Sequence, residues 1–144
     1  MSWKNVRSSI VAGLEALTPA TTRNSAQRFK HVKTALENTS RDRVFAVVAS
    51  GPSSQIAAVS TTTKRYLTEA SIVIRYMMSR ERVEDEDRVE EDVRQITDWM
   101  LTQGNHHADF CAFVATGDTW FDVELTIEDD SNSWLRIDFV AHHV

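Results

Sequence analysis

The sequence KRYLTEASIVIRYMM, residues 64–78, alternates between apolar and polar side chains along its length. One parity is mostly apolar, with Thr68 as its polar exception, and comprises Tyr66, Ala70, Ile72, Ile74, Tyr76 and Met78. The other parity carries Glu69, Ser71 and Arg75. Because successive side chains of a β-strand point to opposite faces of a sheet, this pattern predicts a long strand with one core face and one mixed face.

The hydrophobic period changes immediately after this strand. Within residues 83–101, Val89, Val93, Ile96 and Met100 recur at steps of four, three and four. This spacing is typical of an amphipathic helix, and we expect the helix to pack on the sheet and to end before Gly104. Its remaining positions are rich in charge: residues 81–94 contain eight acids and three arginines.

Two further elements are predicted before the long strand. Residues 2–17 place Trp3, Val6, Ile10, Leu14 and Leu17 at helical spacing, and Pro19 ends that helix. Residues 43–50 are rich in β-branched side chains and end at Gly51-Pro52, which predicts a strand buried on both faces.

The other segments of the N-terminal half give weaker signals. Residues 18–28 are polar and read as a loop, and residues 51–63 read as a long polar connection. Residues 29–38 fit a short helix and an extended segment about equally well, so both alternatives stay open.

The C-terminal part predicts three more strands, at 110–115, 119–127 and 134–142. Phe121, Val123, Leu125 and Ile127 alternate with polar residues, and a polar link at 128–133 predicts a β-hairpin between the last two strands. Trp120 and Trp134 fall on the face opposite Phe121 and Leu135. Exposed tryptophan is typical of interfaces, although a covering helix or loop would explain the pattern equally well.

Helices and strands do not alternate regularly, which argues against a doubly wound sheet. The sequence therefore predicts one α+β domain over residues 1–144. We expect a mostly antiparallel sheet with the N-terminal helix and the central amphipathic helix packed on one face. A hydrophobic fraction of 42% is enough for one core of this size. One cysteine, no signal peptide and no membrane-spanning run lead us to expect an unprocessed intracellular chain with no membrane partner.

The net charge of −5 is unevenly distributed. Residues 1–43 contain eight lysines and arginines against three acids, so the rest of the chain is strongly acidic. A basic surface on one copy could meet an acidic surface on the next, or both could be solvated faces; the two readings stand side by side. The basic residues match no nucleic-acid-binding motif, so we expect no specific nucleic-acid binding.

The chemistry-bearing residues do not converge. Glu84 to Asp87 are consecutive and fan outward on a helix, where Glu84–Arg88 and Glu90–Arg94 are spaced as surface ion pairs. Neighbouring histidines at 106–107 and 142–143 point to opposite faces if they lie on strands. Cys111 reads as a small buried residue. We therefore expect no enzymatic activity, no metal and no cofactor.

Four stretches carry a family resemblance: RVFAVVASG at 43–51, KRYLTEASIVIRYM at 64–77, DVRQITDWML at 92–101 and SWLRIDFVAHHV at 133–144. In order, length and pattern the chain resembles the tail terminator (tail completion) proteins of long-tailed bacteriophages. The resemblance implies a structural virion protein of the tail and neck, assembled in the host cytoplasm. Its subunits would form a cyclic homo-oligomer, a hexamer, that caps the tail tube and ends tail polymerisation.

The resemblance also implies partners: the tail tube protein on one side of the ring and the head connector or stopper protein on the other. Alternative functions are another neck component, such as a head-completion or stopper protein, and a small metal-binding domain built around the histidines. On charge and tryptophan placement, the predicted interface residues are Arg41, Arg43, Lys64, Arg65, Glu84, Asp85, Asp87, Glu91, Trp120 and Trp134.

Overall fold

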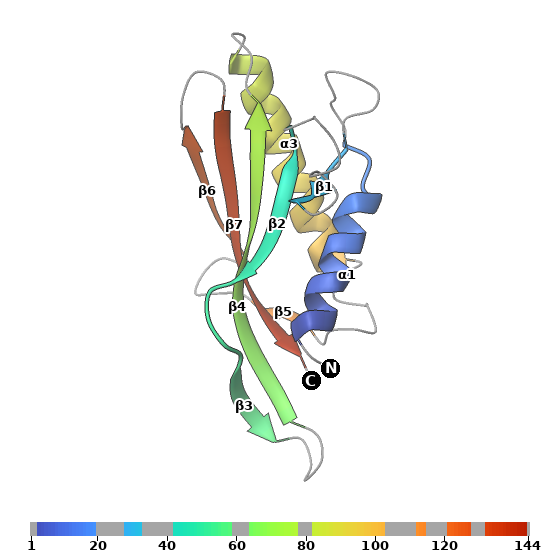
Figure 1. Cartoon of the computed structure of the whole chain (residues 1–144), viewed down its shortest axis with the longest axis vertical. Helices are drawn as coiled ribbons and strands as arrows, with labels where there is room; N and C mark the ends of the chain where they lie inside the picture. The colour runs from blue at the N-terminus through green and yellow to red at the C-terminus, as the bar shows by residue number, and fades with distance from the viewer. Residues whose placement is uncertain are drawn as a thin grey trace.

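A computed structural model of the chain has an α+β fold in which two helices lie against a mostly antiparallel sheet (Figure 1). The structure describes residues 3–19, 28–32, 42–58, 64–77, 82–102, 112–114, 121–127 and 132–143. Within these ranges the helices are α1 (Trp3–Ala16) and α3 (Arg82–Thr102). The strands are β1 (Lys30–His31), β2 (Val44–Ala49), β3 (Ser54–Ala58), β4 (Lys64–Met77), β5 (Ala112–Val114), β6 (Asp122–Ile127) and β7 (Asn132–His143).

Two long antiparallel strands, β4 and β7, form the centre of the sheet. They pair over twelve residues, from Tyr66–His143 to Met77–Asn132. The strand predicted at 64–78 is therefore confirmed, and its apolar parity is the buried one: Ala70, Ile72, Ile74 and Tyr76 lie in the core. The predicted hairpin of the last two strands is also confirmed, because β6 pairs antiparallel with β7.

Each long strand has two short neighbours on its outer side. β4 pairs with β3 near its start and with β2 further along, and β1 adds a short parallel pairing to β2. On the other side β7 pairs first with β6 and then with β5. Among the described strands, β1, β2 and β3 thus form one edge of the sheet, and β6 and β5 form the opposite edge.

Both helices cover the same face of the sheet, as predicted. Val6, Ile10 and Leu14 of α1 are fully buried, and so are Ile96 and Met100 of α3. They join one core with strand residues that all point to that face, among them Phe45, Val47, Ile72, Ile74, Leu135, Ile137 and Phe139. Burial of this helix-facing side of β4 and β7 follows directly from their alternating sequence.

Three predictions for the N-terminal half need correction or completion. Residues 54–58, predicted as part of a loop, form β3 and make a hairpin with β4 that extends beyond both helices (Figure 1). The strand at 44–49 is buried on one face only, since Val48 is 49% exposed. Residues 30–31, which the sequence left undecided, are extended and pair with β2.

Gly13 of α1 lies directly against the indole ring of Trp99 in α3. A Cβ atom at this position would overlap the indole ring of Trp99 in α3. Glycine lowers the stability of a helix, but at this position it leaves room for the Trp99 ring, which a larger residue would obstruct.

We expect Gly13→Ala to destabilise the protein by about 1–3 kcal/mol, because overpacking outweighs the better helix propensity of alanine. Urea unfolding of the two proteins measures this difference. In a Trp99→Leu background the same substitution should become neutral or stabilising, since the obstructing ring is gone. An equal loss in both backgrounds would show that Trp99 is not the cause.

Candidate functional site

A cluster of charged side chains is enclosed between α3 and the sheet. Asp42 and Arg43 precede β2, Tyr76 lies in β4, and Arg88 and Asp92 lie in α3; all five are buried. Arg43 donates two hydrogen bonds to the Asp92 carboxylate, from Nε at 2.8 Å and from Nη2 at 3.0 Å. Tyr76 Oη donates a third to the same carboxylate, at 2.8 Å.

The second ion pair of the cluster lies beside the first. Arg88 Nη1 donates to Asp42 Oδ2 at 2.6 Å, and Arg88 Nη2 donates to the carbonyl oxygen of Met77 at 3.2 Å. The Met77 amide in turn donates to Asp42 Oδ1 at 2.9 Å. The Arg43 guanidinium also lies 5.6 Å from the centre of the Phe29 ring. Both ion pairs therefore join α3 to the end of the β2–β4 pairing.

The backbone at Arg43 explains how two consecutive residues enter the same layer. Neighbouring side chains in a strand point to opposite faces. Arg43, however, has a φ of 56°, in the left-handed region that non-glycine residues rarely adopt. This local turn lets Asp42 and Arg43 both face α3, while the Arg43 carbonyl accepts a hydrogen bond from the amide of Lys30 at 3.1 Å.

Burial controls the ionisation of the cluster. Desolvation raises the pKa of Asp92 above its ordinary value, while the hydrogen bonds from Arg43 and Tyr76 act in the opposite direction. The pKa of Tyr76 is raised well above its ordinary value by burial and by the charge of Asp92. Tyr76 therefore remains protonated and serves as a hydrogen-bond donor.

The cluster is enclosed and connects elements of the fold. The side chains of Arg43 and Asp92 are 0% exposed, so a substrate has no route to them without α3 moving away. Desolvation offsets much of the attraction within a buried ion pair, so its net contribution to stability is small even though removal of one partner is costly. Here two ion pairs set the position of α3 relative to β2 and β4.

This cluster overturns two expectations from the sequence. Arg43, predicted to lie at an interface, is enclosed in the molecule and presents no surface to a partner. Arg88, predicted to belong to a charged surface of the helix, is buried and bonds to Asp42. One signal could have revealed the cluster: Asp92 lies three residues after Val89 and four before Ile96, on the apolar stripe of the helix.

A second polar chain ties the end of β7 to the base of the β3–β4 hairpin. Thr68, the polar exception on the core face of β4, shares hydrogen bonds with His143 Nε2 at 2.7 Å and with Ser53 Oγ at 2.6 Å. The His143 ring stacks on Tyr66, with the ring centres 6.1 Å apart.

Among the described residues no three acidic, histidine or cysteine side chains come together as metal ligands would.

The other predicted interface residues are distributed over several elements. Asp87 and Glu91 are exposed on α3, and Trp134 is exposed on the sheet face away from the helices, where Arg75 lies 5.5 Å from its ring centre. Arg41 and Trp120 lie outside the described residues. Only the backbone is described for four more: Lys64 and Arg65 at the start of β4, and Glu84 and Asp85 in α3. Of the described side chains, Asp87 and Glu91 lie on α3 and Trp134 lies on the opposite face of the sheet, so these three do not form a single patch.

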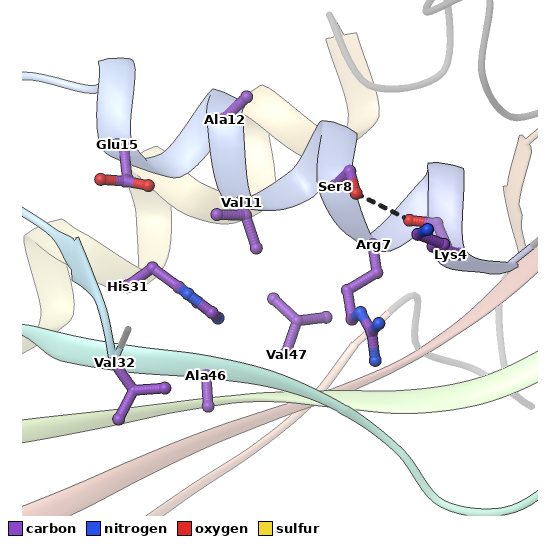
Figure 2. A pocket seen from close by; sticks show the side chains of 10 residues that line it. All are labelled: Lys4, Arg7, Ser8, Val11, Ala12, Glu15, His31, Val32, Ala46 and Val47. Carbon is purple, nitrogen blue, oxygen red and sulfur yellow. Dashed lines mark hydrogen bonds between the residues drawn. The ribbon is translucent and has the colours of Figure 1, made fainter. Parts of the chain in front are cut away.

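A groove of about 510 Å³ opens between α1 and the outer edge of β2 (Figure 2). Figure 2 shows Val11 and Arg7 pointing from α1 toward β2, with Val47 and His31 facing them from the sheet. Lys4 lies near Arg7 on the same side of the helix, and both are exposed. We call this feature the α1 groove; its lining is apolar in the middle and mostly basic along the helix, with one acid, Glu15.

The floor of the α1 groove ends at an open strand edge. β1 pairs only with Val44 and Phe45 of β2. In the part of the chain that the structure describes, no strand pairs with the outer edge of residues 46–49. Unpaired strand edges present amide and carbonyl groups to any further strand, so this edge is able to accept one.

The opposite edge of the sheet is apolar and also open. Val123 and Leu125 of β6 pair with the core residues Ile137 and Leu135 of β7, so they face the helix side of the sheet. They are nevertheless 44% and 39% exposed. The strand prediction for 119–127 is confirmed, but its apolar face is left partly uncovered by the described helices.

Comparison with known proteins adds no assignment: no protein-family model and no curated protein matches the chain. Neither described helix is long and apolar enough to cross a membrane.

Proposed function

We propose that the protein is a structural subunit of the virion of a long-tailed bacteriophage, a tail terminator that forms a ring on the end of the tail tube. The observation that carries the proposal is the pair of unlike sheet edges. The edge at β2 has a groove with basic side chains, and the edge at β6 has exposed apolar side chains. Two unlike edges of this kind suit a head-to-tail contact between copies. Such heterologous contacts close into rings when the rotation between subunits allows it.

Two further features support this function. The order of α1, the long strand, α3 and the C-terminal hairpin is the order on which the family resemblance rests. The β3–β4 hairpin extends away from the helices and gives each subunit an arm for a second protein (Figure 1). In the proposed ring this arm contacts the tail tube or the head connector.

Electron microscopy of particles from a phage lacking the gene tests the function. If the protein is a tail terminator, we expect the mutant to make tails of uncontrolled length, because tube polymerisation then lacks its stop signal. If it is instead a head-completion or stopper protein, we expect tails of normal length together with heads to which no tail is joined. Normal particles, or the absence of the protein from purified virions, would contradict both neck functions.

The oligomeric state gives an independent test. We expect sedimentation or native mass measurements of the purified full chain to show a closed oligomer of defined size, six copies by the resemblance. A protein that stays monomeric up to the highest attainable concentration would remove the ring. Both measurements use the unmodified protein and need no knowledge of its partners.

A further inference from the structure

We infer that the sheet face turned away from the helices packs against the same face of a second copy, about a two-fold axis that crosses the strands at the level of Ile72. The inference goes beyond the proposed function and does not require the ring. Two observations carry it: this face is partly apolar, and its charges are placed so that they complement those of a second copy turned over onto it.

The first observation concerns the apolar side chains of this face, which we call the outer face. It is formed by alternate residues of β2, β4, β7 and β6, whose neighbours in each strand point to the helix side (Figure 1). An antiparallel sheet covered on one side usually carries polar residues on the other. Strand β2 departs from this rule, because its outer-face residues are Val44, Ala46 and Val48. Val48 is 49% exposed, and Trp134 on β7 is 36% exposed.

The apolar outer face of β2 explains why its sequence predicts burial on both sides. In one copy the helices cover only the side of Phe45 and Val47. A second sheet stacked on the outer face covers the other side, as in a β-sandwich. A second copy of the chain supplies such a sheet.

The second observation is the order of the charges along the two central strands. Four cross-strand pairs of β4 and β7 follow one another on the outer face: Arg75–Trp134, Val73–Arg136, Ser71–Asp138 and Glu69–Val140. At their centre lies the core pair Ile72–Ile137. On β4 the base Arg75 and the acid Glu69 are equally far from this level, on opposite sides of it. On β7 the base Arg136 and the acid Asp138 are arranged in the same way.

This order makes the outer face complementary to itself. A two-fold axis that lies between two stacked sheets and crosses the strands turns each strand to face its own copy, running in the opposite direction. With the axis at the level of Ile72, Glu69 faces Arg75 of the second copy, and Arg136 faces Asp138 of the second copy. Each contact occurs twice, as in every isologous interface.

The same rotation brings apolar side chains together. Val48 faces Ala46 of the second copy, and Trp134 faces Val140 of the second copy. Stacked sheets lie about 10 Å apart, so side chains from both copies fill the space between them. The apolar contacts supply most of the affinity, while the charge pairs fix the register and the choice of partner.

One pair of positions at the rim opposes the arrangement. Glu124 of β6 faces residue 122 of the second copy, which is also an acid. The Glu124 side chain is 59% exposed and already bonds to Arg136 at 2.7 Å. Solvent screening therefore keeps this repulsion small compared with the contacts nearer the axis.

Charge reversal tests the inference. Glu69→Lys places a lysine opposite Arg75 in both symmetry-related contacts, and Arg75→Glu places two acids opposite each other. We expect either variant to raise the dissociation constant between the two copies at least about tenfold. In sedimentation experiments its mass should fall toward half that of the wild type. Circular dichroism and thermal unfolding verify that each variant is folded.

Rescue shows whether the two charges meet between copies. The double variant Glu69→Lys with Arg75→Glu again joins opposite charges, and so does an equal mixture of the two single variants. Both should recover the mass of the wild type. Within one copy the two residues are six positions apart on one strand, about 20 Å, so rescue cannot arise inside a subunit. Failure of both rescues would overturn the inference.

Two valine substitutions test the apolar part of the contact. Val48→Asp introduces a charge between the stacked sheets, and we expect it to abolish the association through the outer face. Val123→Asp is the matched control, because Val123 is similarly exposed, at 44%, but lies on the helix side of the edge strand β6. It should leave this association intact. Equal effects of the two substitutions on it would contradict the arrangement.

The outcomes separate this inference from the proposed function. If the wild-type protein forms a dimer but no larger closed species, the ring fails and the inference stands. If it forms a ring whose mass neither charge reversal changes, the inference fails and the ring stands. A wild-type protein that stays monomeric at the highest attainable concentration would remove both.

Discussion

We expect Asp92→Ala to destabilise the protein by about 3–5 kcal/mol, the cost of leaving a buried charge without its partner. Asp92 accepts hydrogen bonds from Arg43 and Tyr76 in a layer closed to water. Removal of the carboxylate leaves a guanidinium and a phenol without that acceptor. Chemical denaturation monitored by tryptophan fluorescence measures the loss, since Trp99 lies on the same helix.

A double-mutant cycle separates the ion pair from other effects of the truncation. Arg43→Ala alone should also be costly, because it leaves the Asp92 carboxylate buried without its cation. The double variant should lose much less than the two single losses together, since no charge remains unpaired at this point. Additive losses would show that the pair is not coupled. Arg88 and Asp42, the second pair, stay unchanged throughout.

Ile72→Ala should cost about 2–5 kcal/mol, because it removes buried methyl groups from the middle of the core and leaves a cavity. Ile72 is fully buried at the centre of β4, where it pairs with Val47 of β2 and with Ile137 of β7. Urea unfolding gives the difference in free energy directly. The m-value should not change, since the surface exposed on unfolding is almost the same.

Val73→Ala is the matched control for this substitution. Val73 is the next residue of the same strand, but it lies on the face away from the helices and is half-buried. Its truncation should cost clearly less than that of Ile72. Equal losses at the two positions would contradict the assignment of a single core face to β4.

The sequence by itself determined the elements whose pattern repeats within one segment. The alternation of residues 64–78 defined β4 and its buried face, the three-and-four spacing from Val89 to Met100 defined α3, and the polar link at 128–133 defined the last hairpin. These signals are local, because a strand or helix exposes its own residues to two different environments with a fixed period. The class of fold followed from their order.

Part of the structure had no such local signal. Strand β3 has few β-branched residues and is identifiable only from its pairing with β4. The predicted surface role of Arg43 failed because its environment is set by Asp92, 49 residues away, and by an unusual backbone angle at Arg43 itself. A charged residue before a strand reads as exposed until its partner is known.

The candidate surfaces divide in the same way. The sequence indicated that a basic N-terminal part and an acidic helix could meet, and it placed apolar side chains on one parity of residues 119–127. Only the tertiary structure decided that α1 and β2 enclose a groove, that β6 is an edge strand, and that Val123 and Leu125 stay exposed. The physical reason is that a period specifies which residues share a face. Which neighbours cover that face depends on the packing of elements distant in the chain.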